Sequence, residues 1–112
     1  MKIYHNPRCK KSREGLAYLS SKCDDFEIVE YLKTGLTIEL LRDLWSRYDG
    51  DIMDLVRTQE KFYKENLKGK VFSSEAWLEQ MVQEPKLLQR PLVDNGTIVV
   101  LANPPQNIDL LF

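Results

Sequence analysis

The first thirty residues alternate between two apolar patterns. Lys2–Tyr4 is short and β-prone, and the turn signal Asn6-Pro7 follows it directly. Over Lys10–Lys22 the apolar side chains recur at helical spacing, at Leu16, Leu19 and Cys23. Residues 26–31 are β-prone again. The pattern therefore predicts a strand, a helix with one apolar face, and a second strand parallel to the first.

The middle of the chain has a helical period. Thr37 is a plausible N-cap for a helix whose apolar face is Ile38, Leu41, Leu44, Trp45 and Tyr48. Residues 52–56 predict a short helix, whereas the charged residues 60–69 are ambiguous. Ser73 is a second N-cap, before a face of Trp77, Leu78, Met81 and Val82, and Pro85 ends that helix.

The last quarter changes period. Two apolar runs, residues 91–94 and 97–101, flank Asn95-Gly96, the strongest short hairpin signal. Pro104 suits the first turn of a closing helix through Ile108, Leu110 and Leu111. The order βαβ, helical block, ββα predicts one α/β domain over residues 1–112. Its outer parts form a thioredoxin-like fold, with a helical insertion at about 35–90 between the halves.

Composition narrows the functional classes. The chain is 43% hydrophobic and 29% charged with a net charge of −1, so nothing in its overall charge favours a nucleic-acid partner or an acidic membrane surface. No apolar run is long enough to span a bilayer, and the N-terminal residues lack the apolar stretch of a signal peptide. We therefore expect a cytoplasmic protein with no membrane partner, whose two cysteines are free thiols.

Cofactor and metal motifs are not visible. The chain has one histidine, no Cys–His cluster and no glycine-rich phosphate loop. We therefore expect no bound metal or cofactor.

Cys9 is the main candidate for chemistry. It falls between the turn and the predicted helix, where free backbone N–H groups and the helix dipole stabilise a thiolate or hold an oxyanion. Neighbouring basic residues add positive charge, and His5 adds either a further charge or a hydrogen bond. The basic neighbours are Arg8, Lys10, Lys11 and Arg13. The alternative is a small buried cysteine beside a solvated basic surface.

The chain offers Cys9 no suitable second thiol for a disulfide. Ser12 stands where a dithiol oxidoreductase has its second cysteine. Cys23 lies fourteen residues further on, roughly 21 Å along a helix, whereas a disulfide needs Cα atoms within about 7 Å. We therefore expect Cys23 to be a core or helix-end residue, and an oxidised Cys9 to be resolved by an external thiol.

Several runs resemble one known family. Ile3-Tyr4-His5-Asn6-Pro7-Arg8-Cys9-Lys10-Lys11-Ser12-Arg13 resembles the active-site loop of the glutaredoxin-coupled arsenate reductase (ArsC) family. Three later runs of this chain resemble the other signatures of that family: Glu30-Tyr31-Leu32-Lys33-Thr34, Leu55-Val56-Arg57 and Gln89-Arg90-Pro91-Leu92-Val93. The resemblance covers essentially the whole chain, and it implies the same thioredoxin-like fold with a helical insertion.

The resemblance also implies a mechanism. Cys9 would attack a small oxyanion such as arsenate and displace water or hydroxide; glutathione as cosubstrate would then attack the arsenic, and glutaredoxin would complete reduction to arsenite. His5 and Ser12 would tune the thiolate. The substrate-binding residues would be Arg57, Arg90, Arg13 and Asn6, with Pro91 as a cis-proline that places Arg90 opposite the cysteine.

One position departs from the family pattern. Asn103 stands where the family usually has a further arginine before a proline. Loss of a charged partner would weaken anion binding by roughly 1.5–3 kcal/mol, about tenfold to a hundredfold or more.

Three functions therefore remain open. They are an arsenate reductase, a glutathione-linked thiol oxidoreductase of the same fold with another substrate, and a non-enzymatic redox-sensing regulator that binds RNA polymerase. The last class commonly uses a Cys-x-x-Cys switch, which Ser12 removes here.

Overall fold

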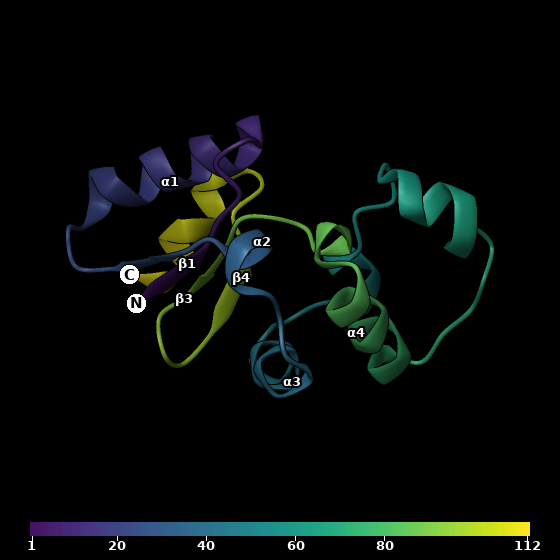
Figure 1. Cartoon of the computed structure of the whole chain (residues 1–112). Helices are drawn as coiled ribbons and strands as arrows, with labels where there is room; N and C mark the ends of the chain where they lie inside the picture. The colour runs from purple at the N-terminus through teal and green to yellow at the C-terminus, as the bar shows by residue number, and fades with distance from the viewer.

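The computed structural model describes residues 1–112, and its four-stranded sheet lies in the half of the molecule that also holds α1 and both termini (Figure 1). The strands are β1 (Lys2–Tyr4), β2 (Glu27–Val29), β3 (Leu92–Asp94) and β4 (Val99–Leu101), in the order β2-β1-β3-β4. β1 pairs parallel with β2, while β3 is antiparallel to both β1 and β4. The predicted βαβ unit and C-terminal hairpin are both confirmed, and Gly96 takes a φ of +94° in the hairpin turn.

The alternation of side chains along the strands gives the sheet a separate core on each face. Ile3, Val93 and Val100 point to one face, where they pack with Leu19 and Ile108. This face is covered by α1 (Lys10–Lys22) and the 3₁₀ helix η4 (Pro105–Leu111), which lie together in Figure 1.

The opposite face carries Tyr4, Leu92 and Val99, which belong to a larger core. Helical segments between the two halves of the sheet supply the rest of that core: α3 (Ile38–Ser46), η1 (Ile52–Leu55), η2 (Tyr63–Leu67), α4 (Ser74–Gln83) and η3 (Pro85–Leu87). Both predicted N-caps are confirmed, because the Thr37 hydroxyl accepts from Leu40 N–H and the Ser73 hydroxyl accepts from Ala76 N–H, each at 3.1 Å. None of the helices combines the length and the apolar character that crossing a bilayer requires.

The second strand is shorter than predicted. The prediction of residues 26–31 was wrong at its end, because β2 stops at Val29 and Tyr31 begins the short helix α2 (Tyr31–Thr34). The pairing with β1 runs out where His5 N–H donates to the Val29 carbonyl. The β-prone Tyr31 is instead buried against the helical segments, with its hydroxyl donating to the Leu88 carbonyl. The ambiguous residues 60–69 contain η2, a single turn of π type.

Candidate active site

Cys9 lies at the junction of the loop after β1 and the helix α1. Its N–H donates to the Asn6 carbonyl at 3.0 Å, which closes the turn, and its own carbonyl accepts the first helical hydrogen bond from Arg13 N–H. Cys9 itself has an extended backbone and is the N-cap of α1. The N–H groups between Cys9 and Arg13 therefore precede the helical hydrogen-bond ladder and face the region of the thiol.

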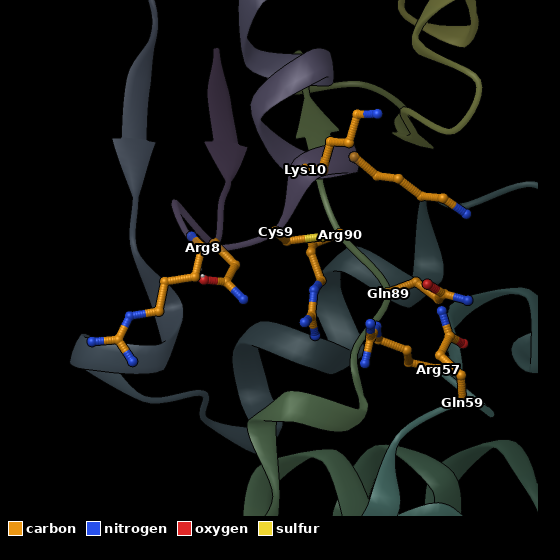
Figure 2. A pocket seen from close by; sticks show the side chains of 9 residues that line it. Arg8, Cys9, Lys10, Arg57, Gln59, Gln89 and Arg90 are labelled. Atoms are coloured by element: carbon orange, nitrogen blue, oxygen red, sulfur yellow. Dashed lines mark hydrogen bonds between the residues drawn. The ribbon is translucent and has the colours of Figure 1, made fainter.

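The Cys9 thiol opens onto a basic pocket of about 380 Å³. The other lining residues share an ability to donate hydrogen bonds: Asn6, Arg8, Lys10, Lys11, Arg57, Gln59, Gln89 and Arg90. Five of these are cations and none is a carboxylate. Figure 2 shows Arg57 and Arg90 directed toward the same space near the Cys9 sulfur, whereas Arg8 runs away from it. The pocket, called the anion pocket below, thus combines one thiol with converging guanidinium groups.

A short antiparallel contact brings the two arginines together. Val56 and Leu88 form an isolated bridge, in which Arg57 N–H donates to the Leu87 carbonyl at 2.7 Å and Gln89 N–H donates to the Leu55 carbonyl at 2.8 Å. The bridge joins segments more than thirty residues apart. It places Arg57 and Arg90 on adjacent backbones facing Cys9.

Arg90 is a buried cation without a carboxylate partner. The residue is 8% exposed, its guanidinium donates to the Lys86 and Leu88 carbonyls, and its Nε has no hydrogen-bond partner. The Arg90–Pro91 peptide bond is cis, the isomer that the family resemblance implies. A buried guanidinium that lacks an acid is stabilised by any negative charge nearby, here a thiolate or a bound anion.

The surroundings of Cys9 favour its thiolate. Partial burial raises the pKa of the thiol, but the Ser12 N–H, the Arg90 guanidinium and the Lys11 N–H together outweigh burial and leave that pKa below its usual value. Two kinds of donor are responsible: the free amides at the start of α1 and one arginine from the far end of the chain. A lowered pKa is the direction expected for a cysteine at the start of a helix among these donors.

His5 and Ser12 lie behind the loop that carries Cys9. The fully buried Ser12 hydroxyl accepts a hydrogen bond from Asn6 N–H at 3.0 Å and is hydrogen-bonded to His5 Nδ1 at 2.7 Å. Burial is the main reason that the pKa of His5 is lowered, so the ring is neutral at pH 7. Of the two roles that the sequence leaves open for His5, an added charge or a hydrogen bond, the structure supports the hydrogen bond. That hydrogen bond holds the loop.

Of two other predicted substrate-binding residues, Asn6 lines the anion pocket and Arg13 does not. Asn6 lines the anion pocket, although its side-chain oxygen is engaged by the Arg8 N–H at 3.1 Å. Arg13 is not part of the lining, because it points back along the loop and its guanidinium donates to the Pro7 carbonyl at 2.9 Å. The structure thus shows Arg13 closing the loop, and its contact with substrate stays a prediction.

Asn103 and Cys23 lie outside the site. Asn103 is exposed and does not line the anion pocket. Cys23 is at the C-terminal end of α1, where it packs against the core on that face, and both cysteines are free.

The sequence patterns did not point to Gln59, Gln89 or Glu60. Gln59 and Gln89 line the anion pocket, and Glu60 forms an ion pair with Arg57. Their sequence positions next to Arg57 and Arg90 were the only available signal. No group of three or more histidine, cysteine or acidic side chains gathers in a way that could hold a metal ion.

Comparison with known proteins shows the family and the fold of the chain. The ArsC family model matches residues 4–110. An arsenate reductase of Neisseria meningitidis is 32% identical over 111 residues, covering 97% of this chain and 95% of the relative, and the uncharacterized protein YfgD of Escherichia coli is 40% identical over 110 residues, covering 96% and 92%. The structure of an arsenate reductase from Vibrio cholerae superimposes with a TM-score of 0.89 at 33% identity, covering 100% of this chain and 98% of the other. These matches confirm the thioredoxin-like fold, and the chain belongs to the ArsC family.

Proposed function

We propose that this protein is a thiol oxidoreductase that reduces arsenate, with Cys9 as nucleophile and external thiols as the source of electrons. The observation that carries the proposal is the anion pocket, in which five cations and no carboxylate surround a thiol of lowered pKa. Relatives at 32% identity that are named arsenate reductase support the choice of substrate.

The first step is an exchange of ligands at arsenic. The Cys9 thiolate attacks the pentavalent arsenic of arsenate, a sulfur–arsenic bond forms, and an arsenic–oxygen bond breaks with loss of hydroxide or water. Arg57 and Arg90 hold the remaining arsenate oxygens through charge-assisted hydrogen bonds. The arsenate anion and the Cys9 thiolate must lie side by side, and these two cations reduce the repulsion between their negative charges.

The electrons come from two thiols. A glutathione thiolate attacks the arsenic of the Cys9 adduct and displaces a second hydroxide or water. A glutaredoxin thiolate then attacks the glutathione sulfur, so the sulfur–arsenic bond breaks with its electron pair left on arsenic. The arsenic, now trivalent, is still bound to Cys9, and hydroxide or water attacks it and displaces the Cys9 thiolate. The products are therefore trivalent arsenite, a glutaredoxin–glutathione disulfide and the regenerated Cys9 thiolate. Each turnover therefore moves two electrons.

The direct test measures arsenite formed from arsenate in the presence of glutathione and glutaredoxin. Cys9→Ser should lose activity, whereas the matched variant Cys23→Ser should retain it, because Cys23 lies at the far end of α1. Equal arsenite production by the wild type and Cys9→Ser would refute the proposal.

A second candidate is reduction of glutathione mixed disulfides, favoured by the exposed position of Asn103 outside the anion pocket. Here Cys9 would attack the glutathione sulfur of a mixed disulfide, take up the glutathione and release the other thiolate. Mass spectrometry after treatment with oxidised glutathione should then find one glutathione on the Cys9 peptide. Robust arsenite production without any such adduct would eliminate this alternative.

A non-enzymatic redox regulator has less support from the site. Ser12, at the position of the second cysteine of a Cys-x-x-Cys switch, is fully buried and hydrogen-bonded within the loop. Co-purification with RNA polymerase, unchanged in Cys9→Ser, would favour the regulator over both enzyme functions.

A further inference from the structure

Arg57 and Arg90, the two arginines directed into the anion pocket, differ in how their charge is balanced. Arg57 forms an ion pair with Glu60, and both side chains are mostly buried, at 25% and 17% exposure. Glu60 does not line the anion pocket. Arg90 has carbonyl partners only.

The local backbone makes the Arg57–Glu60 pair a fixed feature. Glu60 N–H donates to the Arg57 carbonyl at 3.1 Å, so the segment turns and the side chains at positions i and i+3 meet. The Glu60 carbonyl in turn accepts from Lys64 N–H at 3.1 Å, which connects the pair to the stretch that leads into η2 (Tyr63–Leu67). At the other end, Arg57 N–H is bonded to the Leu87 carbonyl.

We propose that Glu60 is a specificity-determining residue of the anion pocket: its carboxylate competes with the bound oxyanion for the Arg57 guanidinium. This inference deepens the proposed function and rests on it, since it concerns the anion that Cys9 attacks. The fixed attraction comes from Arg90, and the Arg57–Glu60 pair sets how strongly the pocket responds to the charge of the anion.

The proposed role of Glu60 predicts that its removal changes the affinity for a dianion more than the affinity for a monoanion. A carboxylate near the pocket repels a dianion twice as strongly as a monoanion, because Coulomb energy is proportional to charge. Removing the Glu60 charge should therefore tighten binding of a dianion by about tenfold and of a monoanion by about threefold, the square root of that factor. A purely structural contribution of Glu60 would change both affinities by the same factor.

The experiment measures anion binding without turnover. Protection of Cys9 from iodoacetamide is followed against the concentration of sulfate, an unreactive dianion, and of nitrate, a monoanion, at constant ionic strength set with a bulky buffer salt. The variants are Glu60→Gln, the charge-retaining Glu60→Asp, and the matched control Glu65→Gln. Glu65 lies on η2 and is exposed, at 59%, with Lys61 as its partner.

We expect Glu60→Gln to lower the sulfate Kd about tenfold and the nitrate Kd about threefold. Glu60→Asp and Glu65→Gln should stay within about twofold of the wild type. In the arsenite assay Glu60→Gln should lower KM for arsenate without raising kcat. Glu60→Ala supplies a second neutral variant if the glutamine form does not fold.

The outcomes separate this inference from the proposed function. Unchanged affinities, weaker binding or equal factors for both anions in Glu60→Gln would overturn the role of Glu60 even if the wild type makes arsenite. The expected charge signature without any arsenite would support Glu60 and refute arsenate reduction. Absence of sulfate protection in the wild type would overturn the inference outright.

Discussion

A single methyl group added at Gly15 tests whether α1 and the Arg90 segment are packed as tightly as the structure shows. Gly15 is buried in α1, and a Cβ there would lie 2.4 Å from Pro91 Cγ, 3.2 Å from Pro91 Cδ and 3.4 Å from Ala102 Cβ. Non-bonded carbon atoms prefer about 3.5–4.0 Å. Because the proline ring is rigid, α1 or the backbone at Pro91 must move to accommodate the methyl group.

Two opposing contributions set the size of the effect. Glycine to alanine inside a helix gains about 1 kcal/mol from helix propensity, whereas overpacking a core costs about 1–3 kcal/mol. The 2.4 Å approach places Gly15→Ala toward the upper end of that cost. We therefore expect a net loss of about 2 kcal/mol in the free energy of unfolding.

Urea unfolding followed by tryptophan fluorescence measures this loss. Ala17→Gly, at an exposed position of the same helix, serves as the control and should lose about 1 kcal/mol from propensity alone. Movement of α1 relative to Pro91 should also separate Cys9 from Arg90, so alkylation of Cys9 in Gly15→Ala should slow at neutral pH. A variant stabilised by about 1 kcal/mol, as at an unconstrained helical site, would refute the packing argument.

Two further predictions concern charge. Arg90→Gln removes a guanidinium that lowers the pKa of Cys9. Alkylation of Cys9 by iodoacetamide at pH 7 should therefore slow by about tenfold, and the pH profile of the alkylation rate should move to higher pH. An unchanged profile would show that the backbone amides of α1 lower this pKa without Arg90. Asp94→Asn breaks the buried pair with Arg47 and should cost about 2–3 kcal/mol at pH 7, less than the about 3–5 kcal/mol of a fully buried pair because Arg47 keeps Asp43. Arg47 holds the pKa of the Asp94 carboxyl below its ordinary value, so the stabilisation is complete above that ordinary value and is lost as the pH falls through the lowered pKa. The difference between wild type and Asp94→Asn in urea unfolding should therefore shrink in strong acid, and a difference independent of pH would contradict this assignment.

Local patterns determined most of the secondary structure. The turn after β1, the N-caps Thr37 and Ser73, and the Asn95-Gly96 hairpin act through neighbouring residues, so the sequence alone predicts them. Where the predictions differed, a long-range contact was responsible: Tyr31 is β-prone, yet it leaves the sheet because its ring and hydroxyl pack against residues around Leu88.

For the site, the sequence by itself predicted the candidate nucleophile and the surroundings that its immediate loop provides. Cys9 at a helix start among basic residues predicts a stabilised thiolate, because the amides and charges responsible lie within a few positions of it. Only the tertiary structure decided which charges act on that thiol. The bridge between Val56 and Leu88 brings Arg57 and Arg90 to the pocket, Arg13 turns back to the loop, and burial makes His5 neutral. These outcomes depend on distance and solvent exposure between segments far apart in the chain, which spacing along the sequence does not encode.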